Sequence, residues 1–185
     1  MYLGRRIVIY GPTGSGKTTL ARQIAERTGL PVVDLDTIFW LPNWTPNPVD
    51  QFRADLDSVL GGYPEGWVVA GNYSAIRDIV LPSVDTVVWL RPPFRVAFWR
   101  LFKRTVDRAW TKKPLWEGNT NTESWRQSFF SRGSILLWSI TNWKNHVKRT
   151  LRNLNEIEHH AQVIELRSGQ EVRRFLASLS AAEVR

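Results

Sequence analysis

One short segment near the start of the chain constrains its fold more than any other feature: residues 11–18 have the sequence GPTGSGKT. The segment fits the pattern G-x-x-x-x-G-K-[ST], and it lies between a β-branched run over 6–10 and a stretch of helical periodicity over 17–28. Glycines allow the backbone to curl so that successive N–H groups point at phosphate oxygens, and the N-terminus of the next helix adds its dipole. The segment therefore predicts a strand–loop–helix unit that binds a nucleoside triphosphate.

The residues of this phosphate-binding loop (P-loop) have separable roles. Lys17 is long enough to reach the β- and γ-phosphates, and the Thr18 hydroxyl is a hard oxygen ligand suited to Mg²⁺. We therefore expect ATP and Mg²⁺ as cofactors. The residues expected to bind the nucleotide are Gly11, Pro12, Thr13, Gly14, Ser15, Gly16, Lys17, Thr18 and Thr19.

Strand and helix patterns alternate along the rest of the chain. Short apolar runs predict strands at residues 6–10, 31–34, 67–70, 86–90 and 163–166. Helical periodicity is expected at residues 17–28, 49–60, 74–81, 94–110, 123–132, 134–158 and 171–179. The alternation predicts an α/β fold with a parallel sheet, in which Trp67, Trp89 and Trp99 are expected in the core.

Length and composition exclude several classes of protein. With 185 residues, the chain has the length of one domain, and its 43% apolar residues exclude disorder as a description of the whole. The absence of Cys excludes a disulfide scaffold, a thiolate metal site and a cysteine nucleophile. No apolar run approaches the ~20 residues of a membrane span, and the first residues lack a signal-peptide layout. We therefore expect a cytoplasmic protein without a membrane partner; the oligomeric state stays open.

The positive charge is concentrated in one stretch. Residues 91–152 hold 14 of the 25 Lys and Arg but 3 of the 17 Asp and Glu. Such an excess is typical of a surface that meets phosphates or a nucleic-acid backbone, and it equally fits a solvated basic face.

Two further segments narrow the interpretation. Residues 33–40, VDLDTIFW, follow the second expected strand, and residues 71–74, GNYS, follow the third. Together with the P-loop they resemble the adenylate-kinase-like proteins often named DNA topology modulation proteins. The resemblance covers nearly the whole chain and implies one P-loop kinase-like domain over 1–185. Its five-stranded parallel sheet has the order 2-3-1-4-5, with an acceptor-binding insertion at about 34–65 and a lid at about 104–134.

The resemblance also suggests which residues meet the phosphoryl acceptor. Asp34 and Asp36 leave the carboxyl end of the second strand, where open α/β sheets bind ligands. In small kinases the second such aspartate contacts an acceptor hydroxyl or orients Mg²⁺ through water, so Asp36 is expected to be catalytic and, with Thr18, to hold the metal. The alternative is a pair of solvated loop carboxylates. The residues expected at the acceptor are Asp34, Asp36, Trp40, Asn72, Tyr73 and Arg77.

Arginines are the second requirement of phosphoryl transfer, because planar guanidinium groups neutralise and align the transferring group. Arg100, Arg104 and Arg108 recur every four residues and share one helical face. The resemblance assigns Arg100 and Arg104 catalytic roles at the entrance to the lid; a solvated basic stripe is the alternative. A second lid arginine is expected at Arg126 or Arg132, and the family's basic residue on the returning helix at Lys144, His146 or Lys148. By itself, His146 suggests nothing catalytic.

The chain departs from the family at one position. Related proteins carry an acid directly before Gly-Asn-Tyr, where this chain has Ala70. We therefore expect an ATP- and Mg²⁺-dependent phosphotransferase that acts on a nucleotide or small hydroxylated acceptor, with its efficiency in doubt. One alternative is a nucleic-acid-associated ATP-binding protein that influences DNA topology. Another is a nucleotide-binding protein that has lost catalysis.

Overall fold

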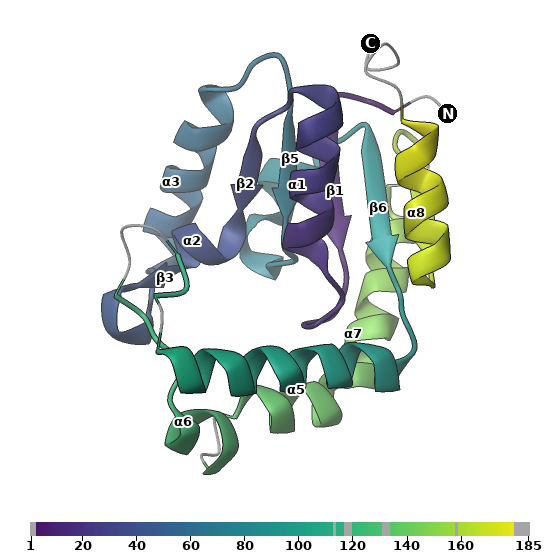
Figure 1. Ribbon diagram of the computed structural model, residues 1–185. Helices are drawn as coiled ribbons and strands as arrows, with labels where there is room; N and C mark the ends of the chain where they lie inside the picture. Colours follow the sequence, from purple (N-terminus) through teal and green to yellow (C-terminus); the bar gives the residue numbers. More distant parts are fainter. Residues whose placement is uncertain (1–2, 113, 117–119, 131–133, 158, 180–185) are drawn as a thin grey trace.

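The computed structural model describes residues 3–112, 114–116, 120–130, 134–157 and 159–179 (Figure 1). Its strands are β1 (Arg6–Tyr10), β2 (Val32–Asp34), β3 (Trp40–Leu41), β4 (Thr45–Pro46), β5 (Trp67–Ala70), β6 (Thr86–Leu90) and β7 (Gln162–Leu166). Its α-helices are α1 (Lys17–Thr28), α2 (Leu35–Phe39), α3 (Val49–Gly61), α4 (Arg77–Val80), α5 (Phe94–Thr111), α6 (Trp125–Phe130), α7 (Ile135–Asn155) and α8 (Gly169–Ser178). Short 3₁₀ helices are η1 (Pro42–Trp44), η2 (Ser74–Ile76) and η3 (Leu81–Ser83).

The main sheet has the order β2-β5-β1-β6-β7, and its pairs are parallel. Numbered along the chain, these are strands 2-3-1-4-5, so the expected α/β fold and strand order are confirmed. All five strands end at the same edge, which places the segments after β1, β2 and β5 side by side. The pair β3–β4 is a separate antiparallel hairpin in the insertion after β2.

Alternate residues of the strands pack against different helices. Ile7 and Ile9 join the buried cluster that contains residues of α1 and α8. Val8 and Tyr10 join the opposite cluster, which contains residues of α3 and α7. Period-2 alternation of a strand produces this division, and helices on both faces explain why β1 and β6 are apolar along most of their length.

The helix α5 lies across the carboxyl edge of the sheet, at the end to which the strand arrows point (Figure 1). It begins after Pro92 and Pro93, buries Ala97 and Leu101, and continues without interruption to Thr111. The same helix leaves Trp99 55% exposed, so the expectation of a core Trp99 was wrong. Trp99 lies on the opposite face of α5 from Ala97 and Leu101, whereas Trp67 and Trp89 in the strands are buried as expected.

Two local structures differ from the sequence-based expectation. Residues 35–39 form the helix α2, because the Asp34 carboxylate accepts a hydrogen bond from the backbone N–H of Asp36 and caps its first turn. The helix expected over 74–81 is divided into η2, α4 and η3. Both segments follow strands of the main sheet and so lie at its carboxyl edge.

We expect a side chain at Gly14 to displace α5 from the P-loop. Gly14 has φ +77°, and a Cβ there would overlap the carbonyl oxygen of Ala97 and lie 3.0 Å from the Leu101 Cβ. Gly14→Ala should therefore lower the free energy of unfolding by about 1–3 kcal/mol, measured by urea denaturation. The matched control is Gly61→Ala at the end of α3, where a Cβ meets nothing within 4 Å. A Gly14→Ala protein as stable as the control would contradict this packing.

Candidate active site

The P-loop connects β1 to α1 at the carboxyl edge of the sheet, and the nine residues expected to bind the nucleotide lie together in it and in the first turn of α1. Gly14 and Gly16 have positive φ, which lets the loop curl. The half-buried Lys17 donates from Nζ to the carbonyl oxygens of Gly11 (3.0 Å) and Pro12 (3.2 Å). Carbonyl oxygens are weaker hydrogen-bond acceptors for an ammonium group than phosphate oxygens, because a carbonyl carries no net charge.

An open groove of about 550 Å³ adjoins the P-loop. One wall is formed by the loop and α1, a second by the start of α5, and a third by the segment from the end of β7 into α8. Among its lining residues are Ser15, Thr19, Val96, Arg100 and Gly169. Its volume and mixed lining suit a flat organic group attached to phosphates in the loop. Arg100 therefore lies on the nucleotide side of the site.

Two aspartates follow β2, and their carboxylates have different partners. The Thr18 hydroxyl donates to Oδ2 of Asp34 (2.9 Å). The other oxygen of Asp34, Oδ1, accepts from the backbone N–H of Asp36 (3.2 Å). Asp34 is also paired in register with Ala70 on the neighbouring strand. Asp34 thus supplies a carboxylate to the Thr18 hydroxyl from the strand next to Ala70.

Asp36 belongs to a chain of three hydrogen-bonded side chains. The Tyr73 hydroxyl donates to Oδ1 of Asp36 (2.6 Å), and the indole N–H of Trp40 donates to the Tyr73 oxygen. Burial, followed by the negative charge of Asp36, raises the pKa of Tyr73, so the phenol stays protonated and keeps donating. Trp40 and Tyr73, both expected at the acceptor, therefore also orient Asp36.

The charges at this edge favour a bound cation. Burial and the neighbouring Asp36 raise the pKa of Asp34, whereas burial lowers the pKa of Lys17. In the described part of the chain, no group of three or more His, Asp or Glu could hold a metal alone. The donors present, one hydroxyl and one carboxylate, fit a Mg²⁺ ion that takes its remaining ligands from phosphates and water.

The three arginines of the α5 stripe have three different environments. Arg100 lines the groove. Desolvation and the charge of Arg108 lower the pKa of Arg104, while Glu123, Asp36 and Asp34 act in the opposite direction. Arg104 is therefore partly desolvated, and its charge interacts with the two carboxylates. Arg108 forms an ion pair with the buried Glu123 (3.2 Å). The catalytic roles expected for Arg100 and Arg104 stay predictions.

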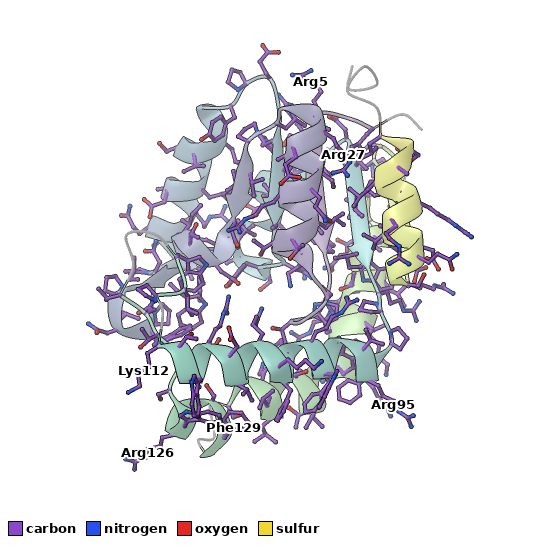
Figure 2. All side chains as sticks on the ribbon, in the orientation of Figure 1. Arg5, Arg27, Arg95, Lys112, Arg126 and Phe129 are labelled. Atoms are coloured by element: carbon purple, nitrogen blue, oxygen red, sulfur yellow. The ribbon has the colours of Figure 1, made fainter. Side chains whose placement is uncertain are left out.

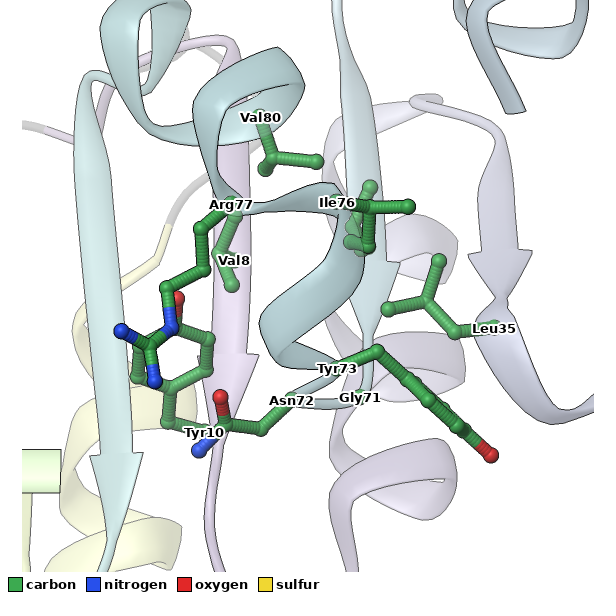
Figure 3. Close-up of a pocket in the computed structure, with 10 residues that line it drawn as sticks. Val8, Tyr10, Leu35, Gly71, Asn72, Tyr73, Ile76, Arg77 and Val80 are labelled. Carbon is green, nitrogen blue, oxygen red and sulfur yellow. The ribbon is translucent and has the colours of Figure 1, made fainter. Parts of the chain in front are cut away.

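Arg77 and Asn72 lie on a different side of the sheet edge from the Tyr73 hydroxyl. Figure 3 shows the Arg77 guanidinium beside the Tyr10 ring, while Tyr73 points the other way. The Nε atom of Arg77 is buried without a hydrogen-bond partner, and the adjoining cavity of about 10 Å³ has room for one water molecule. Burial raises the pKa of Tyr10 to about 12. The acceptor role of Asn72 and Arg77 is therefore less directly supported than that of Asp36, and it stays a prediction.

The insertion is fastened to the segment that follows α5. The buried Asn121 accepts from the backbone N–H of Trp44 (2.9 Å) and donates to the carbonyl of Leu41 (2.9 Å). The Trp44 indole N–H donates to the carbonyl of Thr122 (3.0 Å). These bonds cross about 80 residues of sequence and hold the β3–β4 hairpin against the returning chain.

Sequence reasoning missed the position of His146. This residue of α7 is half-buried, hydrogen-bonds to the backbone of Gly11, and is close enough to Lys17 for that charge to affect its pKa. Its neighbours Lys144 and Lys148 are exposed. The sequence signal that pointed to this position was the family resemblance, which placed a basic residue of this helix at Lys144, His146 or Lys148. Arg126 points away from the sheet at the outer side of α6 (Figure 2), and Arg132 lies outside the described residues.

Similarity to known sequences covers only part of the chain. A family model described as isopentenyl transferase matches residues 5–43. An adenylate kinase of Streptomyces lividans is 30% identical over 106 residues, which are 56% of this chain and 46% of that protein. An adenylate dimethylallyltransferase of Agrobacterium tumefaciens (strain T37) is 60% identical over 51 residues, 28% of this chain and 21% of that protein. The chain thus spans less than half the length of either relative.

Similarity to solved structures extends over the whole chain. A shikimate kinase from Acinetobacter baumannii, in complex with shikimate, has a TM-score of 0.56 at 18% identity and covers 94% of this chain and 89% of its own. A sugar kinase from Janibacter sp. HTCC2649 has a TM-score of 0.51 at 20% identity and covers 99% of both. The chain therefore has a kinase-like P-loop fold. These likenesses do not extend to a role in DNA topology. No helix in the described part of the chain is long and apolar enough to cross a membrane.

The contact of His146 with the P-loop makes stability depend on pH. Burial and the charges of Lys17 and Arg149 lower the pKa of His146 from 6.5 to about 4. As the pH falls, the imidazole of His146 is protonated in the unfolded chain before it is protonated in the folded protein. The folded state therefore has its full stability above about pH 6.5 and loses stability as the pH falls toward 4. Between these values, the free energy of unfolding should fall by up to about 3 kcal/mol more in the unsubstituted protein than in His146→Asn.

Urea denaturation at several pH values measures this difference. The control is His159→Asn, because His159 is exposed and distant in sequence from the P-loop contact. It should keep the profile of the unsubstituted protein. Identical profiles for all three proteins would exclude a buried neutral His146.

Proposed function

We propose that this chain is an ATP- and Mg²⁺-dependent phosphotransferase that transfers a phosphoryl group to a small acceptor. The observation that carries the proposal is the convergence of Lys17, Asp36 and Arg104, from three separate elements, at the carboxyl edge of a kinase-like sheet. Phosphoryl transfer needs these components: a cation for the phosphates, a group for the nucleophile, and a guanidinium for the transferring charge. The similarity to an adenylate kinase and the whole-chain likeness to kinases support the same chemistry.

On the nucleotide side, the P-loop amides and Lys17 would bind the β- and γ-phosphates, and the nucleoside would occupy the groove beside Arg100. Lys17 would exchange the carbonyls of Gly11 and Pro12 for charged oxygens, which are stronger acceptors. Thr18 and Asp34 would hold Mg²⁺, whose charge neutralises the phosphate oxygens. This assignment replaces Asp36 by Asp34 as the carboxylate nearest to the metal, because Asp34 is the one bonded to Thr18.

On the acceptor side, Asp36 would receive the proton of the attacking hydroxyl. The Tyr73 hydroxyl holds Oδ1 of Asp36, which leaves Oδ2 to meet the acceptor. A new bond then forms between the acceptor oxygen and the γ-phosphorus, the bond to the β-phosphate oxygen breaks, and ADP leaves. Arg104 would neutralise the charge of the transferring group. The bonds of Asn121 to the insertion would limit the access of water, which otherwise competes as an acceptor.

Transfer of a dimethylallyl group is a second candidate function. The observation in its favour is the isopentenyl transferase match over residues 5–43 together with the 60% identity to an adenylate dimethylallyltransferase. Both matches cover less than a third of this chain, whereas the likeness to kinase structures covers nearly all of it. We therefore favour phosphoryl transfer. The nucleic-acid-associated alternative is not better supported, because the two tRNA dimethylallyltransferases among the relatives match only 44% and 17% of this chain.

Replacement of Lys17 should weaken ATP binding selectively. A charged hydrogen bond is worth about 1.5–3 kcal/mol, so Lys17→Ala should raise the Kd for Mg-ATP by roughly 10- to 100-fold, measured by calorimetry. Lys144→Ala removes an exposed lysine of α7 and should leave the Kd within about twofold. ATP binding by Lys17→Ala as tight as that of the control would refute the nucleotide site.

Replacement of Asp36 should separate chemistry from nucleotide binding. General-base catalysis contributes about 10²–10⁴-fold, so Asp36→Asn should lower kcat for ADP release with an acceptor by at least about 100-fold. The Kd for Mg-ATP should change by less than about threefold, because Asp36 contacts Tyr73 rather than the loop. Asp57→Asn on the exposed side of α3 is the control. A normal kcat for Asp36→Asn would remove Asp36 from the reaction.

A further inference from the structure

We propose that the acceptor is an uncharged, ring-bearing polyhydroxyl compound, a sugar or a nucleoside, and not a nucleoside monophosphate. This inference rests on the proposed phosphotransferase function and concerns the chemistry of the acceptor side alone. A monophosphate acceptor requires cations that are free to bind its phosphate in addition to those that bind ATP. The charges around the insertion and the partners of each nearby arginine argue against such a second anion site.

The insertion itself is acidic. Residues 34–65 contain six Asp or Glu and a single basic residue, Arg53. Both terminal nitrogens of Arg53 are bound to the Asp78 carboxylate, at 2.7 and 2.6 Å. This pairing is bidentate, so the guanidinium presents its strongest donor pair to Asp78 rather than to a ligand. An anionic acceptor would enter a region of like charge, which weakens binding and slows association.

Two further arginines, Arg108 and Arg77, are paired or turned away from Asp36. Arg108 pairs with the buried Glu123. The Arg77 guanidinium lies beside Tyr10, whereas the Tyr73 side chain that binds Asp36 points the other way (Figure 3). Arg104 faces Asp36 and is the cation that phosphoryl transfer itself requires. Arg126 points outward, away from the sheet (Figure 2). Among the described residues, no arginine near Asp36 is left for a second phosphate.

The carboxylate of Asp36, on the acceptor side, still needs a hydrogen-bond donor, unlike that of Asp34. Both oxygens of Asp34 have donors, from Thr18 and from the backbone of Asp36. Asp36 has a donor, Tyr73, on Oδ1, and in the described part of the chain no hydrogen bond reaches its Oδ2. An ionised carboxylate only accepts hydrogen bonds. A hydroxyl group supplies the missing donor, whereas a phosphate dianion offers further acceptors to a site that already has too many.

Aromatic rings form the wall beyond Asp36. Trp40 and Trp44 meet edge to face at 5.6 Å between ring centres, and Trp44 and Trp116 at 6.0 Å. The hydrogen bonds of Trp44 to Asn121 and Thr122 fix this wall in place. Flat indole rings bury the apolar faces of sugars and nucleobases, while the adjacent carboxylate binds their polar edges. A wall of this kind next to Asp36 matches a neutral ring with hydroxyl substituents.

Matched pairs of acceptors test the inference directly. Each pair consists of a neutral compound and its phosphate: adenosine and AMP, thymidine and its monophosphate, glucose and glucose 6-phosphate, ribose and ribose 5-phosphate. Phosphoryl transfer from Mg-ATP is followed by mass spectrometry of the product. We expect kcat/KM for the neutral member to exceed that of its phosphate by at least about tenfold in each pair that reacts. An equal or greater value for a phosphate overturns the inference while upholding the phosphotransferase.

Binding of the same pairs decides the inference when no acceptor reacts. Quenching of tryptophan fluorescence, with a non-hydrolysable ATP analogue present, measures acceptor affinity without turnover. Tighter binding of a neutral member supports the inference even though the proposed reaction then fails. Tighter binding of a phosphate, or no binding of any neutral member, overturns it.

Removal of an arginine's carboxylate partner should change the preference between neutral and phosphorylated acceptors. Glu123→Gln frees Arg108, and Asp78→Asn frees Arg53 at the surface, where a folding defect is not expected. Either variant should lower the KM or Kd of a phosphate acceptor by at least about fivefold, with the Kd for Mg-ATP unchanged. Glu26→Gln, on the exposed side of α1, is the matched control for loss of one negative charge. Unchanged selectivity in both variants, equal to the control, contradicts the role of these ion pairs.

Discussion

The close approach of α5 to the P-loop is the contact on which the rest of the site depends. Gly14 permits it, because this residue has a positive φ and no side chain to separate the loop from Ala97 and Leu101. As a result, a single straight helix crosses the carboxyl edge of the sheet and brings Arg100 to the groove and Arg104 to the carboxylates. A loop one methyl group larger would move both arginines away from the P-loop and Lys17.

The electrostatics of the edge explain how a site without an acid at position 70 can still be organised. Two partly desolvated carboxylates next to each other destabilise one another, as the raised pKa of Asp34 indicates. The fold compensates by giving them distinct partners: Thr18 and a helix N-terminus for Asp34, and Tyr73 for Asp36. In the proposed reaction, this division places Asp34 on the nucleotide side and Asp36 on the acceptor side. Asp34 would then serve as the metal ligand in a chain that has Ala70.

The sequence predicts the architecture and the phosphate loop well because both follow from local patterns. Apolar runs identified all five strands of the main sheet, and the glycine spacing located the loop. The family resemblance supplied the strand order and Asp36. Contacts between distant segments were not predictable: His146 against the P-loop, Asn121 against Trp44, and the outward direction of Trp99. Each depends on packing between segments far apart in the sequence, and helical periodicity alone does not state which face of a helix meets the sheet.

One family match is confined to the N-terminal part of the chain. The match to the isopentenyl transferase model covers residues 5–43, which include the P-loop, Asp34 and Asp36 but not α3, α5 or α7. A curled glycine backbone recognises phosphate oxygens and little else. In the proposed reaction, selectivity for the acceptor would therefore reside in the elements that follow residue 43. In this chain those elements contribute Trp44, which packs on Trp40 and is bound by Asn121, and Arg108, whose charge is neutralised by Glu123. They also contribute Arg104, whose charge interacts with Asp36.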